Sequence, residues 1–182
     1  IQTWTVPATA TFTIEVWGSQ GGENEHDTAG GKGARMKGEF SLNQGEILKI
    51  LIGQKGGDNN GVNTYSGGAG GGSFVAKSDN TALIIAGGGG GAGYTNNSDT
   101  GGTTSNSGRD GGYSNGGSGG SDGNGGGSAP GSPSGGAGFT GNGTQGSNFG
   151  GGAPRSFTNG GTGQNVSSGS CCGGTGGFGG GS

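Results

Sequence analysis

The sequence predicts an all-β fold with essentially no α-helix. We expect an antiparallel β-sandwich or jelly-roll-like platform that carries a bundle of glycine-rich polyproline-II helices. In the first 86 residues, apolar side chains alternate with polar ones or form short runs, and the i, i+3, i+4 spacing of a helix is absent. From Gly87 to Ser182 the chain has no Ile, no Leu and one Val, while 40 of these 96 residues are glycine. That half cannot fold by burying aliphatic side chains, so it either packs backbone against backbone or stays disordered.

The clearest expected strand is 10–17, where Phe12, Ile14 and Val16 alternate with Thr and Glu. A period of two places one face of a strand in the core. Residues 2–6 alternate in the same way, and residues 35–42 do so with an interruption at a glycine. These three segments are therefore expected to be strands with one buried face.

Two further segments are apolar almost without a break: 46–52 (EILKILI) and 81–86 (TALIIA). Runs of this kind are typical of strands that are covered on both faces. Residues 73–77 form a shorter expected strand between them. Six strands are predicted in all.

Short and long connections alternate between these strands. Residues 7–9, 43–45 and 78–80 have the length of hairpin turns. The connections 18–34 and 53–72, and everything after residue 87, are long and rich in glycine. In an up-and-down antiparallel arrangement every second connection lies at the same end, so the glycine-rich material is expected on one side of the platform.

The glycine-rich segments do not have the strict three-residue repeat of collagen. A flexible linker is the default interpretation of such composition, but 96 residues is long for a structureless segment. Polyproline-II helices offer an ordered alternative, because their N–H and C=O groups point outward and can bond to neighbouring helices. Ordering glycine costs about 1–2 kcal/mol per residue, so only a cooperative lattice on a preformed sheet could offset that cost.

The expected organisation is a β-sandwich core at 1–91, with glycine-rich excursions at 18–34 and 53–72, and a polyproline-II region at 92–182 packed on the same domain. The net charge of −3 gives no basic surface for nucleic acid. No window approaches the roughly 20 apolar residues of a membrane span. We therefore expect neither a nucleic-acid partner nor a membrane span in this chain.

Several motifs resemble a known family. The stretches QTWTVPATATFTIEVWGSQGG, GGKGARMKGEFSLNQGEILKILIGQKGG, GGGSFV and ALIIAGGGGG occur in order over residues 2–91. They closely resemble the glycine-rich domain of anaplastic lymphoma kinase and leukocyte tyrosine kinase, a module also found in glycine-rich surface proteins of protists and bacteria. The resemblance implies a β-sandwich-like platform bearing polyproline-II glycine helices. The receptors carry several cysteines in this region, whereas this chain has two. The residues with which the receptors contact their ligands have no clear counterparts in this chain, so none of them is transferred.

Candidate modification sites are few. Three glycosylation sequons begin at Asn96, Asn142 and Asn165, and they favour an extracellular or cell-surface location weakly, because Asn, Ser and Thr are common in this chain. Cys171 and Cys172 are adjacent, so a bridge between them would be strained. Two alternatives remain equally open: two unpaired thiols, or pairing with another chain or with a part of the protein outside this sequence. A CxxC spacing is absent, so no zinc site is expected.

No cluster indicates catalysis, and neither a cofactor nor an enzyme activity is expected. His26 is the only histidine and lies in an acidic loop, which is more typical of a solvated turn than of an acid–base site. The glycine runs lack the Lys-Ser/Thr and the following helix of a phosphate-binding loop. Large aromatic groups are expected to dock the glycine helices onto the sheet or a neighbouring subunit, with stacking on a ligand or sugar as the alternative. These residues are Trp17, Tyr113, Phe139, Phe149, Phe157 and Phe178.

The sequence thus favours a non-catalytic extracellular structural module that self-assembles into a surface filament or matrix. Its partners would be copies of itself or another surface protein. The alternatives are an adhesin or a ligand-binding fragment of a receptor ectodomain, and a flexible spacer with a small folded head.

Overall fold

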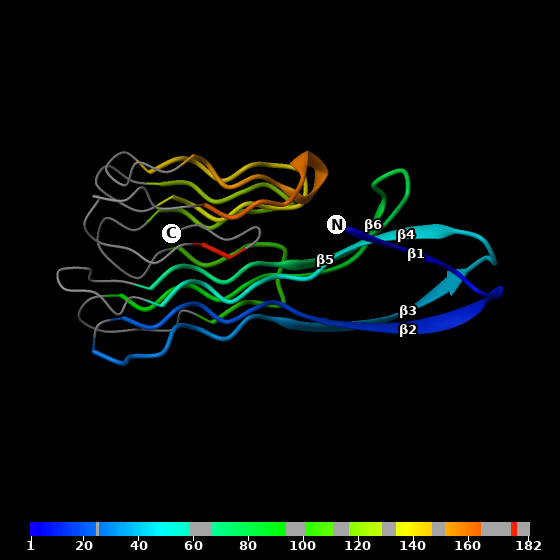
Figure 1. The fold of residues 1–182 in the computed structure, drawn as a ribbon, viewed down its shortest axis with the longest axis horizontal. Coiled ribbons are helices and arrows are strands. Elements are labelled where there is room, and N and C mark those ends of the chain that lie inside the picture. Colours follow the sequence, from blue (N-terminus) through cyan, green and yellow to red (C-terminus); the bar gives the residue numbers. More distant parts are fainter. Residues whose placement is uncertain are drawn as a thin grey trace.

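A computed structural model describes residues 1–24, 26–58, 67–93, 101–110, 117–128, 134–146, 152–164 and 176–177. It is an all-β structure with two antiparallel sheets (Figure 1). One sheet has the strand order β1-β4-β5-β6, and the other pairs β2 with β3. The strands are β1 (Gln2–Thr5), β2 (Ala10–Trp17), β3 (Arg35–Leu42), β4 (Ile47–Leu51), β5 (Ser73–Lys77) and β6 (Ala82–Ala86). All six expected strands are confirmed to within a residue at either end.

The expected turn at 78–80 is a hairpin, in which the Lys77 N–H donates to the carbonyl of Thr81 at 2.8 Å. The expected hairpins at 7–9 and 43–45 are wrong. The first segment joins β1 to β2 and the second joins β3 to β4, and in both cases the two strands belong to different sheets. The two corners lie together, because the Val6 N–H bonds to the carbonyl of Glu46 at 2.8 Å. Connection length alone does not distinguish a hairpin from a corner between sheets.

The two sheets enclose the main core. Its fully buried members are Val6, Leu42, Leu48, Val75 and Ile84. The β2–β3 pair contributes half-buried apolar side chains at alternate positions, and Phe12, Ile14 and Val16 are among them as the sequence predicted. The hydrophobic effect therefore holds the sandwich together through a small but continuous cluster.

A second core covers the opposite face of the four-stranded sheet. Leu51, Phe74 and Ala76 lie there, against Phe139 and Phe157 from the glycine-rich half of the chain. Phe157 begins the only described helix, the single 3₁₀ turn η1 (Phe157–Asn159). Part of the sheet is thus covered on both faces, which explains the unbroken apolar runs in β4 and β6.

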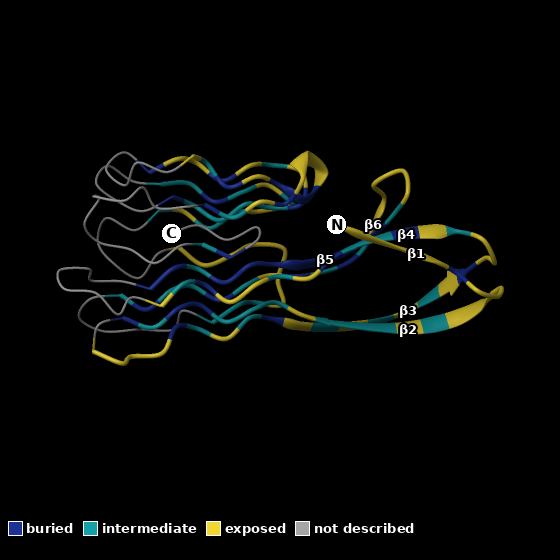
Figure 2. Ribbon diagram, viewed as in Figure 1, coloured by how far each residue is buried: buried dark blue, intermediate teal, exposed yellow. Residues whose placement is uncertain are grey.

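The glycine-rich excursions leave the platform at one end, as expected, and run beside one another (Figure 1). Buried positions recur along these traces, although they carry almost no apolar side chains (Figure 2). None of the described helices is long and apolar enough to cross a bilayer.

Candidate functional site

The most distinctive part of the molecule is a lattice of glycine-rich backbone segments. We define the first lattice as residues 18–22, 30–34, 53–57, 67–72 and 87–92. Segment 18–22 lies at its centre and exchanges main-chain hydrogen bonds with the other four. Three of these contacts are Gly18 N–H to Ala34 O at 2.9 Å, Ser19 N–H to Gly71 O at 2.9 Å and Gly56 N–H to Gln20 O at 3.0 Å.

The hydrogen bonds repeat every three residues. Gly18 and Gly21 donate to Ala34 and Gly31, so both chains advance by three positions between bonds. The same step recurs from Ser19 and Gly22 to Gly71 and Gly68, from Gly31 and Ala34 to Gly90 and Gly87, and from Gly67 and Gly70 to Ala92 and Gly89. A repeat of three with bonds only to neighbouring segments is the pattern of polyproline-II helices, which have three residues per turn and no internal hydrogen bonds.

Glycine is required where two segments touch. A Cβ atom on Gly18 would collide with the carbonyl of Gly87, and one on Gly21 would collide with the carbonyl of Gly90. The inward positions of the other segments meet backbone in the same way, at Gly30, Gly33, Gly53, Gly56, Gly67, Gly70, Gly88 and Gly91. The segments are therefore closer together than any side chain allows, and their peptide groups are satisfied by one another.

The described residues between 101 and 177 form a similar arrangement, which we call the second lattice. Gly126 donates to the carbonyl of Gly136 at 2.7 Å, and its own carbonyl accepts from Thr144 at 3.0 Å. This second lattice touches the first through main-chain bonds from Gly102 to Lys32 at 2.7 Å and from Gly177 to Ala69 at 3.0 Å.

Two of the expected docking aromatics attach this half to the sheet. The rings of Phe139 and Phe157 stack with centroids 5.0 Å apart, and Phe157 lies 5.6 Å from Phe74 of β5. Both side chains are buried. Trp17 does not dock: it is 54% exposed, and the guanidinium of Arg35 lies 5.7 Å from its ring. Trp17 therefore does not serve as one of the docking aromatics, because its side chain points out of the sandwich at the end of β2.

Most of the other predicted site residues lie outside the described residues. These are Asn96, Tyr113, Phe149, Asn165, Cys171, Cys172 and Phe178. The sequon residue Asn142 is exposed, and its Oδ1 accepts hydrogen bonds from the Ser156 N–H at 2.9 Å and from Asn159 Nδ2 at 3.0 Å. His26 lies in an exposed turn, where its N–H donates to Asn24 Oδ1 at 3.0 Å.

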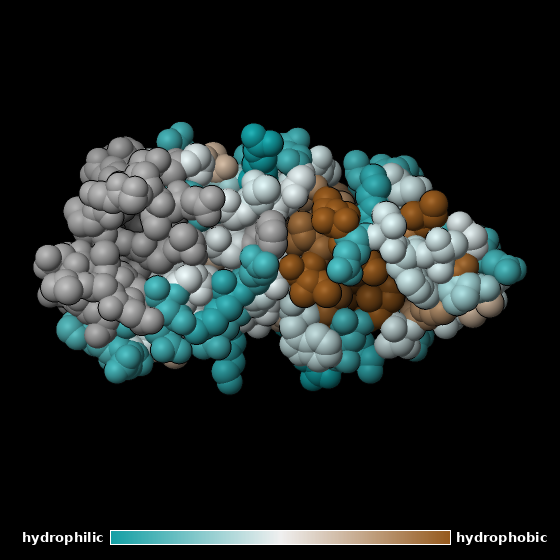
Figure 3. Space-filling model, in the orientation of Figure 1, coloured by the Kyte–Doolittle hydropathy of each residue, from teal (hydrophilic) through white to brown (hydrophobic). Residues whose placement is uncertain are grey.

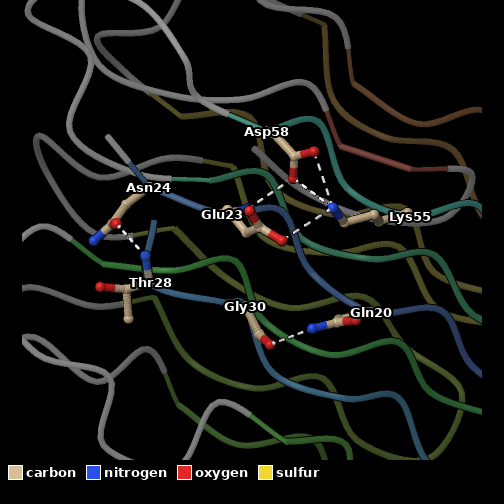
Figure 4. A network of polar contacts seen from close by, with 7 residues as sticks. All are labelled: Gln20, Glu23, Asn24, Thr28, Gly30, Lys55 and Asp58. Atoms are coloured by element: carbon tan, nitrogen blue, oxygen red, sulfur yellow. Dashed lines mark hydrogen bonds and ion pairs between the residues drawn. The ribbon is translucent and has the colours of Figure 1, made fainter. Parts of the chain in front are cut away.

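Polar side chains form hydrogen bonds and ion pairs between segments at the outer end of the first lattice (Figure 4). Lys55 donates to Asp58 at 2.9 Å, and Asp58 also accepts the N–H of Glu23 at 2.9 Å. This network joins the excursion after β2 to the excursion after β4. Within the part of the chain that the structure describes, no group of three or more His, Cys, Asp or Glu side chains is placed to hold a metal ion.

Asn24 is a buried residue whose side chain cross-links the backbone, a role that the sequence did not reveal. Its Oδ1 accepts the N–H of Thr28 at 2.9 Å (Figure 4). The same Oδ1 accepts the N–H of His26, and Asn24 Nδ2 donates to the carbonyl of Gly93 at 2.8 Å. The side chain thus closes the turn and ties it to the end of the first lattice. An Asn in an acidic loop is common, and only the fold shows that this one is 3% exposed.

We predict that Asn24→Ala lowers the free energy of unfolding by about 2 kcal/mol, because two N–H donors and a carbonyl in a partly buried turn lose the side chain that bonds them. Thr28→Ala is the matched control, since it keeps the amide that Asn24 binds and removes only an exposed side chain. It should change stability by less than about 0.5 kcal/mol. Urea denaturation measures both, and equal midpoints for the two variants would contradict the assignment.

Two exposed carboxylates have lowered pKa values. The hydrogen bond from Lys55 is the main cause for Asp58, whose pKa falls below the ordinary 3.8, and the Glu23 N–H adds to it. The N–H of Thr81 is the main cause for the lowered pKa of Asp79. Both groups are more acidic folded than unfolded, so the folded state binds protons less readily.

Stability is therefore expected to fall as the solution is acidified. A carboxylate with a lowered pKa contributes stability above its unfolded pKa and loses it as pH falls through the folded value. The urea midpoint should be constant near neutrality and decline below about pH 5. Asp58→Asn should be less stable at pH 7 and should show a shallower decline. An unchanged slope in this variant would mean that Asp58 is not held by Lys55.

The Ser73 hydroxyl lies where strands give way to glycine segments. It donates to the carbonyl of Trp17 at 2.6 Å and accepts the N–H of Gly53 at 3.0 Å. The ends of β2 and β4 are thereby joined to the start of β5.

No protein-family model matches the chain.

Proposed function

We propose that this chain is a non-catalytic structural module that associates with other proteins, first with copies of itself, at the cell surface or outside the cell. The observation that carries the proposal is where the exposed apolar surface lies. Among the residues that the structure describes, four of the five exposed large apolar side chains lie on or beside the β1–β4 strand pair: Ile1, Trp4, Ile47 and Ile52. Ile1 and Ile52 lie together at one end of this pair, where they line a common hollow, and an apolar surface of this kind marks an interaction site more often than single scattered residues do.

The rest of the architecture supports this proposal. The two lattices fix an elongated shape mainly through main-chain hydrogen bonds (Figure 1). Only 10% of the residues are charged and the net charge is −3, so copies approach one another with little repulsion. The extracellular setting rests on the three sequons, and a surface filament or matrix is the assembly that we infer.

Sedimentation velocity from micromolar to millimolar concentration tests the proposal, together with negative-stain imaging of the concentrated sample. We expect the weight-average mass to rise with concentration and assemblies of regular spacing to appear. Adhesin or receptor-like reception of a different ligand would instead leave the isolated chain monomeric. Dispersed monomers at every concentration would overturn self-association.

A further inference from the structure

We propose that β1 is the surface of self-association, and that it pairs antiparallel with β1 of a second copy of this chain. The inference rests on the proposed function and names the contact that would carry it. Within the part of the chain that the structure describes, β1 lies at the edge of the four-stranded sheet and pairs with β4 alone. All four of its residues are exposed.

The register shows which main-chain groups of β1 are free to bond. The Val6 N–H bonds to Glu46, and in an antiparallel pair the bonded residues alternate. Trp4 and Gln2 therefore exchange bonds with β4. The N–H and C=O groups of Thr3 and Thr5 point the other way, toward solvent, as on any unpaired edge.

Apolar side chains flank this edge. Ile1 is 57% exposed and Ile52 is 67% exposed, and together with Gln2, Ile50, Leu51 and Gly160 they line a hollow of about 190 Å³. Hydrophobic surface gathers beside the amino terminus and β1 (Figure 3). The edge itself carries no charged residue, although natural edge strands commonly use Lys or Pro to prevent pairing.

A second copy fits this edge because β1 is complementary to itself. Antiparallel pairing about a twofold axis at Thr3 places Thr3 opposite Thr3, Thr5 opposite Ile1, and Trp4 opposite Gln2 of the other copy. The outward N–H and C=O groups of both strands are then satisfied. The two four-stranded sheets become one continuous sheet of eight strands.

The same register continues a row of side chains across the contact. Thr5 lies between Ile47 of its own sheet and Ile1 of the second copy, so the three side chains lie in one row on the same face of the sheet. Trp4, which is 39% exposed and already packs edge-on against Phe12, gains the Gln2 side chain of the second copy as a cover. A four-residue edge buries less than the roughly 1,600 Å² of a standard interface, so the association is expected to be weak and reversible.

Two substitutions at one position test this contact in the full chain. Thr3→Pro removes the outward N–H, and proline is tolerated at an edge position whose N–H faces solvent. Thr3→Lys keeps the amide but places two like charges opposite each other at the twofold axis. Thr13→Lys is the matched control, since it adds the same charge at an exposed position of β2, in the other sheet.

We expect both Thr3 variants to weaken self-association by about tenfold or more in sedimentation, and Thr13→Lys to leave it unchanged. Circular dichroism and urea midpoints check that each variant is folded. If Thr3→Pro does not fold, the result for Thr3→Lys decides the test. Amide hydrogen exchange adds a second measurement. The Thr3 and Thr5 amides should gain protection as protein concentration rises, whereas those of Gln2 and Trp4 are protected already.

The outcomes separate this inference from the proposed function. If the wild-type chain associates but the Thr3 variants do so equally well, or the Thr3 and Thr5 amides stay unprotected, another surface is used and only the β1 pairing is overturned. If the wild-type chain is monomeric at every concentration, both fail. If the Thr3 and Thr5 amides of the wild-type chain gain protection only when a foreign peptide is added, the edge binds that peptide and not a second copy, and the inference is overturned.

Discussion

Replacing Gly88 by alanine is expected to cost about 3 kcal/mol or more of folding free energy, whereas the same change one residue earlier, at Gly87, is expected to cost nothing. A Cβ on Gly88 would collide with the carbonyl of Gly70 and with the backbone of Gly71. A core packed with side chains relieves such a collision by changing rotamers. Here the new Cβ meets backbone atoms, which have no alternative rotamers. The collision is therefore relieved only if whole segments move apart and break their hydrogen bonds.

Gly87 is the matched control for Gly88→Ala. A Cβ there meets no atom within 4 Å, and the backbone has no positive φ that would strain alanine. Alanine also reduces the conformational freedom of the unfolded chain, so Gly87→Ala should be neutral or stabilising by up to about 1 kcal/mol. Urea midpoints of both variants give the comparison. Equal stability would mean that segment 87–92 does not touch segment 67–72 in solution.

The second large effect is expected for Phe157→Ala, at about 3–5 kcal/mol. The Phe157 side chain is 2% exposed and packs between Phe139 and Phe74. Among the described residues, only Phe139 joins it in the second core from this half of the chain, so few side chains can move to fill the cavity. We expect the second lattice to open before the first.

Amide hydrogen exchange measures that order of opening. In Phe157→Ala the amides of Gly126 and Gly135 should lose protection, while those of Gly21 and Ala34 in the first lattice should retain most of theirs. Thr162→Ala, at an exposed site in the same half, should change neither. Equal loss of protection in both lattices would show that they unfold as one unit and that the phenylalanine dock is not their boundary.

The strand positions could be predicted because alternation and apolar runs report burial directly. Val6 and Leu42 show the limit of that approach. Both are apolar residues at the ends of strands, and nothing local indicates that the chain turns there into the other sheet. Pairing between β1 and β4 is decided by contacts some 45 residues apart along the chain, which a local pattern does not contain.

The sequence contains a pattern that indicates the lattice, but other glycines make the pattern hard to recognise. Glycines recur as Gly-x-x-Gly within each segment, at 18 and 21, 53 and 56, and 88 and 91. Extra glycines between them hide the repeat when the whole chain is searched for a collagen pattern. Buried polar residues such as Asn24 and Ser73 gave no signal, because their importance depends on which main-chain groups the fold brings to them.

The step of three also limits how such a chain can change in length. Inserting one residue into segment 18–22 would rotate everything beyond it by a third of a turn, so that side chains would replace hydrogen atoms along the contact lines. Inserting three residues restores the phase and merely lengthens the rod. A module built this way grows or shrinks by whole turns, while its outward-facing positions can vary freely in chemistry.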